Sequence, residues 1–217
     1  MQREEIWQAV RAERLSLAAL LEGLTPDQWE HASACPGWRV RDVAAHLTLA
    51  PHATYGLVLK ELAKARGDFD RMIHRTAVAR AAAPTADLVA DLRAIADSRR
   101  LAPFTTINEP LLDVLVHGQD IAVPLGVDRP MPPAGATTAA DRVWRKAFPF
   151  FARRKLRGLR LAATDVRWSR GDGELVEGPI AALLVLLTGR RYTLPQLTGP
   201  GVALLTGTPH SQKGRVP

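Results

Sequence analysis

A chain of 217 residues, 47% of them hydrophobic, is long enough for one large domain or for a medium domain followed by a small one. Its single cysteine, Cys35, excludes an internal disulfide and a cysteine-rich zinc motif. Because no apolar run reaches membrane-spanning length, we expect a cytoplasmic protein without a membrane partner. The net charge of +7 comes from 24 arginines and 5 lysines that are scattered except at 153–155 and 190–191. Without a basic stripe interleaved with aromatic residues, nucleic acid is not the expected partner.

Apolar residues at spacings of three and four predict long helices in the first half of the chain. Between the first two lies a constrained loop, ASACPGWRV, with Pro36-Gly37 at its turn. Pro51 ends or kinks the second helix, 52–66 continues it, and 67–83 fits either another helix or an irregular crossing. Four long helices within about 125 residues are typical of an antiparallel bundle, and we expect them at 3–22, 39–50, 85–100 and 109–126.

The pattern changes after Gly126, where a Pro- and Gly-rich connector begins. The spacing then predicts a helix at 137–152, a hairpin with its turn at 171–173, an apolar helix at 180–191 that stops at Gly189, and a last strand at 199–207. The fold class is therefore mainly α with a small α+β part. The expected divisions are a helical bundle at 1–126, a connector and helix at 127–155, a small α+β domain at 156–207 and a tail at 208–217.

Acidic and histidine side chains share one line along the helix expected at 109–126. Asp113, His117 and Asp120 lie at i, i+4 and i+7, so they rise from one face. A carboxylate and an imidazole one turn apart can bind one divalent ion, but a third ligand must come from elsewhere. In the second helix Asp42 and His46 are also one turn apart, so that this acid could orient the imidazole.

Three segments resemble the mycothiol-dependent maleylpyruvate isomerase family, whose N-terminal half is a DinB-like four-helix bundle. They occur in the family's order and extend the resemblance over roughly residues 5–205. The segments are CPGWRVRDVAAHL at 35–47, DVLVHGQD at 113–120 and VEGPIAALLVLLTGR at 176–190.

The resemblance implies a divalent metal, usually zinc, bound by His46, Asp113 and His117. The family's acid is more often Glu, so Asp113 is a departure, one methylene shorter. Two neutral imidazoles and one carboxylate leave a fourth zinc position open, which is typical of a catalytic site and can take a thiol. The resemblance implies that this thiol is mycothiol, the low-molecular-weight thiol of actinobacteria, and that Arg190 holds a carboxylate of the substrate or of the thiol.

Each of these residues also has a structural interpretation. The two histidines could form a buried hydrogen-bonded pair, Asp113 could be a surface carboxylate, and Arg190 could neutralise a helix C-terminus. Asp120 fits either an imidazole-orienting role or loop stabilisation. Cys35 is expected to be inert, because nothing beside it in the sequence supplies a base.

The sequence therefore predicts a metalloenzyme that uses a small thiol for thiol transfer or thiol-assisted isomerisation of a small organic acid or other electrophile. It is expected to be a monomer or a homodimer. The alternatives are a DinB-like module that binds a metal without catalysis, and a regulatory protein of unassigned activity.

Overall fold

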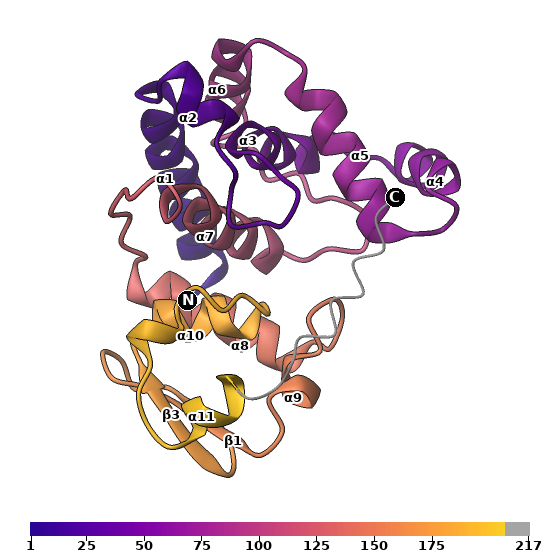
Figure 1. Ribbon diagram of the computed structural model, residues 1–217. Coiled ribbons are helices and arrows are strands. Elements are labelled where there is room, and N and C mark those ends of the chain that lie inside the picture. The colour runs from indigo at the N-terminus through magenta and orange to yellow at the C-terminus, as the bar shows by residue number, and fades with distance from the viewer. Residues whose placement is uncertain (207–217) are drawn as a thin grey trace. The chain divides into compact units, whose positions relative to one another are not determined.

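The computed structural model describes residues 1–206 and contains two compact units, Met1–Ala139 and Ala140–Pro217 (Figure 1). The expected fold class, a mainly α protein with a DinB-like bundle and a small α+β part, is confirmed. The predicted boundaries of the domains stay predictions, and the predicted tail at 208–217 lies outside the described residues. Within residues 1–206, no helix is both long enough and apolar enough to cross a membrane.

The bundle is formed by α1 (Arg3–Glu22), α3 (Val40–Leu49), α6 (Thr85–Ala94) and α7 (Asn108–Ala122). Both α1 and α3 pack against α6 and α7, so each helix turns its apolar stripe inward. α6 and α7 are each shorter than predicted, because residues 95–98 and 123–126 form turns after them. The fully buried large side chains of this core are Leu17, Leu21, Leu88, Leu92, Leu111, Leu115 and Ile121.

Shorter helices complete this unit: α2 (Pro26–Glu30), η1 (Ala50–His52), α4 (Tyr55–Lys64) and α5 (Phe69–Ala81). The undecided segment at 67–83 is thus a helix, α5, which packs on α3, while α4 packs on α5 (Figure 1). The Asp68 side chain starts α5 by accepting a hydrogen bond from the Arg71 backbone N–H at 2.9 Å. Pro51 lies in η1, so the second predicted helix ends before it, as its missing N–H requires.

The connector that follows α7 is fixed to the bundle by the buried side chain of Arg129. Its Nη2 donates to Glu13 Oε2 at 2.8 Å and to the Glu13 carbonyl oxygen at 3.1 Å, and its Nη1 donates to Ser16 Oγ at 2.8 Å. The guanidinium passes so close to α7 that a Cβ at Gly118 would lie 2.7 Å from Arg129 Nε. The glycine inside this helix is therefore explained by close packing.

The second unit combines short helices with a three-stranded sheet. α8 (Pro133–Arg145) begins in the first unit, and the chain continues through α9 (Ala152–Lys155), β1 (Leu159–Ala163), β2 (Ser169–Gly171), β3 (Glu174–Gly178), α10 (Ile180–Leu187), η2 (Leu194–Gln196) and α11 (Gly201–Thr206). The strand order is β2-β1-β3, with β2 antiparallel and β3 parallel to β1.

The predicted hairpin turn at 171–173 is wrong, because β2 and β3 lie on opposite sides of β1. Gly171 (φ 81°) and Gly173 (φ 122°) carry the chain across the end of β1. A Cβ at Gly173 would lie 2.2 Å from the Gly158 carbonyl oxygen, which accepts a hydrogen bond from the Glu174 N–H. The two glycines therefore allow a tight connection from β2 past the end of β1 to β3, and not a turn between two paired strands.

Two further predictions in this unit are corrected. The predicted last strand is α11, a helix with Leu205 buried, because a short apolar run does not by itself distinguish strand from helix. The helix predicted at 137–152 begins earlier, at Pro133, and ends at Arg145, since Pro149 disfavours a helical continuation. The apolar helix α10 ends at Leu187, and Gly189 follows it with φ 90°, as expected of a helix stop.

Candidate functional site

The CPGW loop is folded by its own hydrogen bonds and attached to α7. Ser33 N–H donates to the Trp38 carbonyl oxygen at 2.8 Å, and Trp38 N–H donates to that of Cys35 at 3.0 Å, with Gly37 at φ 78° in the turn. Ala34 N–H donates to the Asp120 carbonyl oxygen at 2.8 Å. The loop therefore holds Cys35 beside the last turns of α7.

The two predicted histidine ligands meet between α3 and α7. The ring centroids of His46 and His117 are 5.1 Å apart, with an angle of 81° between the ring planes. Asp113, one turn before His117, lines a small cavity of about 10 Å³ together with His46. The structure thus brings the three side chains from two distant segments into one neighbourhood, and their metal binding stays a prediction.

Arg14 lines the same cavity and was not expected there. It is only 4% exposed, and its Nη1 donates to the carbonyl oxygens of Ile95 at 2.7 Å and Ser98 at 3.1 Å, just after α6. Burial lowers the pKa of the Arg14 guanidinium, and the nearby Asp113 carboxylate opposes that shift. Its sequence position carried a signal, since Arg14 interrupts the apolar stripe of Val10, Leu17 and Leu21.

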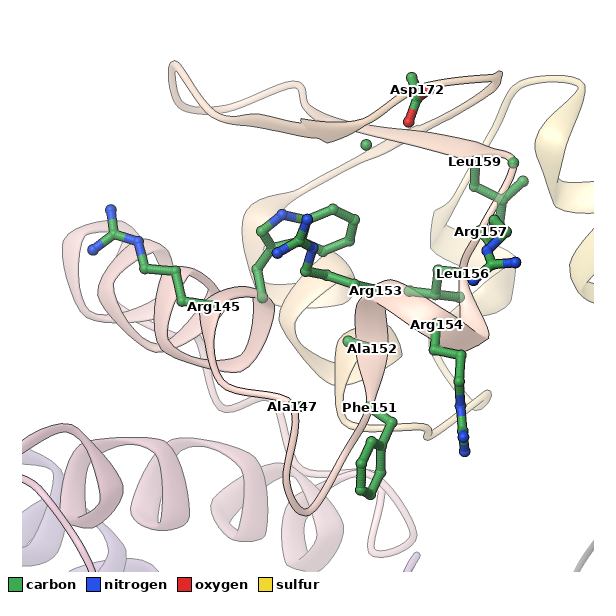
Figure 2. A pocket seen from close by; sticks show the side chains of 13 residues that line it. Arg145, Ala147, Phe151, Ala152, Arg153, Arg154, Leu156, Arg157, Leu159 and Asp172 are labelled. Carbon is green, nitrogen blue, oxygen red and sulfur yellow. The ribbon is translucent and has the colours of Figure 1, made fainter.

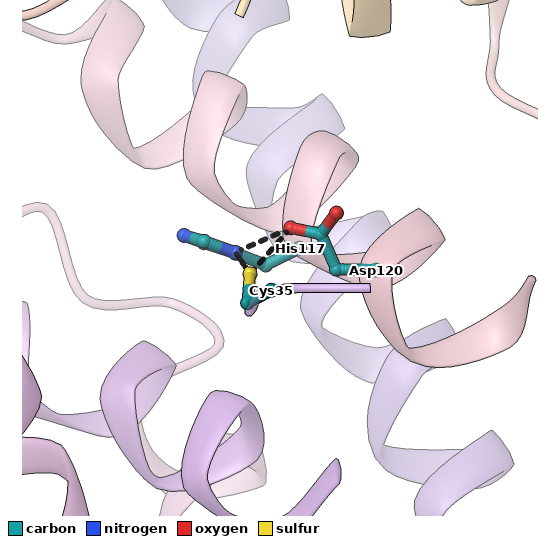
Figure 3. A group of neighbouring side chains, drawn as sticks. All are labelled: Cys35, His117 and Asp120. Carbon is teal, nitrogen blue, oxygen red and sulfur yellow. Dashed lines mark hydrogen bonds and ion pairs between the residues drawn. The ribbon is translucent and has the colours of Figure 1, made fainter. Parts of the chain in front are cut away.

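His117, Asp120 and Cys35 form a second set of contacts on the other side of the imidazole. His117 Nδ1 lies 2.9 Å from Asp120 Oδ2, and Cys35 Sγ donates to the same oxygen at 3.1 Å. Figure 3 shows the other ring nitrogen of His117 pointing away from both side chains. Burial disfavours the charged imidazolium, yet the hydrogen bond to Asp120 and the nearby Cys35 raise the pKa of His117 to about 9. Asp120 therefore fixes the orientation of this imidazole.

The expectation that nothing beside Cys35 could act as a base is wrong. Its Sγ lies 3.8 Å from His117 Nδ1 as well as against Asp120. One ligand atom from each of Cys35, His117 and Asp120 lies within 4.8 Å of the other two, and among residues 1–206 this is the one group placed closely enough to hold a metal ion. The ligand atoms of His46, Asp113 and His117 do not lie that close to one another. Sequence inspection missed the group with Cys35 because Cys35 and His117 are separated by 82 positions.

Asp42 and Arg190 occupy other surroundings. The Asp42 carboxylate accepts hydrogen bonds from the Arg39 backbone N–H and side chain at 2.9–3.0 Å, so it caps α3. Burial raises the pKa of Asp42, but its bonds with Arg39 outweigh this and lower it. Arg190 follows α10 in the second unit, where its N–H donates to the Val185 carbonyl oxygen at 3.3 Å, and its role in binding a carboxylate stays a prediction.

A known domain family matches the larger part of the bundle in sequence. Residues 10–103 match the mycothiol maleylpyruvate isomerase N-terminal domain. This segment is similar to that domain, over less than half of the chain. The resemblance inferred from the sequence motifs is thereby confirmed. The matched range of the mycothiol maleylpyruvate isomerase N-terminal domain includes the CPGW loop and His46 and ends before α7.

Solved structures extend the likeness in fold to the rest of the chain. A crystal structure of the mycothiol-dependent maleylpyruvate isomerase is 15% identical, with a TM-score of 0.66, and covers 97% of this chain and 95% of its own. A structure of a histidine-to-alanine mutant of that isomerase is 17% identical, with a TM-score of 0.54 and the same coverage. No curated protein matches this chain significantly. The likeness in fold to these solved structures thus extends beyond the segment at 10–103 into the second unit.

Proposed function

We propose that this protein is an enzyme that uses a divalent metal, most simply zinc, to activate mycothiol for isomerisation or thiol transfer on a small electrophile. The observation that carries the proposal is the meeting of His46 with His117 beside Asp113, where His46 lies in the segment that matches the mycothiol maleylpyruvate isomerase N-terminal domain and the other two follow it. The alternative of a non-catalytic metal-binding module has the same ligands without turnover.

The placement of the two imidazoles fits a shared ion. Two rings bound to one tetrahedral zinc at about 2.0–2.1 Å have centroids roughly 5 Å apart, and those of His46 and His117 are 5.1 Å apart. Asp113 supplies the carboxylate, and its charge interacts favourably with the nearby Arg14 guanidinium. When bound, the metal would take a thiol at its fourth position and lower the pKa of that thiol.

Asp120 is proposed to orient a ligand of the metal, and Arg190 is proposed to bind the substrate or the thiol. Asp120 accepts a hydrogen bond from the Nδ1–H of His117, which leaves the other ring nitrogen as the ligand atom, the usual way in which a metal-binding histidine is oriented. Arg190 is proposed to hold a carboxylate of the substrate or of the thiol, because a guanidinium pairs with a carboxylate in two parallel hydrogen bonds. A small organic acid such as maleylpyruvate suits that chemistry.

The second donor set competes for the same histidine. Cys35, His117 and Asp120 could hold an ion through Nδ1 instead, and a cysteine ligand would make that site chemically different. In that arrangement the ion would already have a thiolate ligand from the protein itself, that of Cys35. This arrangement favours a structural or sensing role over thiol activation.

The test is turnover of maleylpyruvate by the intact protein. We expect activity only when both mycothiol and the metal are present, complete loss after removal of the metal by a chelator, and recovery on addition of Zn²⁺. Circular dichroism of the chelated protein controls for unfolding. Turnover that is unchanged without the thiol, or after verified metal removal, would contradict the proposal.

A further inference from the structure

Positive charge is concentrated in the second unit. Residues 140–206 contain 12 arginines and lysines against 5 acidic residues, whereas residues 1–139 contain 15 against 17. Between positions 142 and 160 there are 8 basic residues and no acidic one. The charge that looks scattered in the sequence therefore gathers where α8 ends, α9 forms and β1 begins.

A cavity of about 530 Å³ opens at this place. Its rim carries Arg145 from α8, Arg153 and Arg154 from α9, and Arg157 from the turn before β1 (Figure 2). Trp144 contributes an indole to the lining. The volume lies within the range of about 300–1,000 Å³ that is usual for small-molecule sites.

The charges of this cavity are largely uncompensated. No described residue within 1–206 forms an ion pair with Arg153 or Arg157. Arg145 lies 3.7 Å from Asp141, but its side chain is 75% exposed, so that pair contributes little. Among the lining residues Asp172 is the one carboxylate. Four arginines against one carboxylate make the lining of this cavity electropositive.

We propose that this cavity binds a small phosphorylated molecule with at least two negative charges and a planar group, independently of the metal site. Guanidinium groups bind phosphate oxygens in pairs of hydrogen bonds, and the indole of Trp144 offers a flat apolar surface to a ring. A nucleoside diphosphate has both features. A half-open pocket of this volume can hold a small ligand, whereas a nucleic-acid duplex would need a charged stripe along the surface.

The test is calorimetric titration of the full chain with ADP, pyrophosphate and adenosine. We expect ADP to bind at one equivalent, pyrophosphate to bind more weakly, and adenosine not to bind. The R153Q/R157Q variant should weaken ADP binding by roughly 100-fold, since it removes two charged contacts and the loss of each corresponds to about tenfold. R160Q/R167Q is the matched control, because it removes the same charge from exposed arginines outside the cavity, and it should change ADP affinity less than about twofold.

If both double variants weaken ADP binding equally, the proposal is overturned in favour of diffuse charge attraction. The same holds if a short DNA duplex binds more tightly than ADP and both double variants weaken its binding equally. Failure of ADP and of pyrophosphate to bind at millimolar concentration to the folded protein would overturn it as well. His46→Ala should leave ADP affinity unchanged, so failure of this proposal is distinguishable from failure of the metal site. Thermal melting of each variant confirms that it is folded.

Discussion

His46→Ala should remove stoichiometric metal from the purified protein and lower mycothiol-dependent turnover by more than about 100-fold. Loss of a hydrogen-bond partner behind a ligand already costs roughly 10- to 100-fold in metal affinity or activity, and loss of the ligand itself should cost more. Metal content by mass spectrometry and initial rates measure the two effects.

His74→Ala is the matched control for this substitution. His74 makes the same edge contact with Trp38 as His46 does, with ring centroids 5.6 Å and 5.7 Å apart respectively. We expect His74→Ala and Cys35→Ser to keep the metal. If Cys35→Ser loses the metal while His46→Ala retains it, the ion belongs to the set of Cys35, His117 and Asp120, and the proposed ligands are wrong.

Arg129→Met should lower the free energy of unfolding by about 3–5 kcal/mol, because it leaves Glu13 buried without its partner. Methionine replaces the aliphatic part of the arginine side chain but not its guanidinium, so the variant loses mainly the charge and the hydrogen bonds to α1. Urea denaturation of the variant and the parent protein measures the difference.

The effect of Arg129→Met should depend on pH. Burial raises the pKa of Glu13, and Arg129 opposes that rise, so in the variant the folded-state pKa lies further above the unfolded value. The protonated, neutral form of Glu13 can therefore stay buried in the variant. The free energy of unfolding falls as the pH rises from the pKa of Glu13 in the unfolded chain to its pKa in the folded protein. The loss should be greater at pH 8 than at pH 5, and Glu13→Leu/Arg129→Met should recover part of it. A loss below about 1 kcal/mol at every pH would show that the pair is unimportant.

The bundle could be predicted because its helices have strong local signals. Each has an apolar stripe at helical spacing, and α7 has Pro110 in its first turn and Pro124 just beyond its end, so the local sequence indicates both the helix and its position. The sheet could not be predicted in the same way. Gly171 and Gly173 permit either a hairpin turn or a crossing past the end of β1, and only tertiary packing against Gly158 distinguishes them.

The site was predictable where its residues share one helix or one motif. Asp113 and His117 follow from spacing, and His46 follows from the resemblance of its motif. Cys35 and Arg14 reach the site only through tertiary contacts, from a loop 82 positions before His117 and from the buried face of α1. A cysteine next to Pro-Gly and an arginine in an apolar stripe have no fixed meaning until their neighbours are known.

The absorption spectrum of the Co²⁺-loaded protein, recorded before and after addition of mycothiol, tests the central claim most directly. That claim is that His46, Asp113 and His117 hold one ion whose remaining position takes an external thiol. We predict no thiolate-to-cobalt charge-transfer band before the thiol is added, and a band that saturates at one equivalent afterwards. A band already present without mycothiol would identify Cys35 as a ligand, and no band after its addition would contradict thiol activation by this metal.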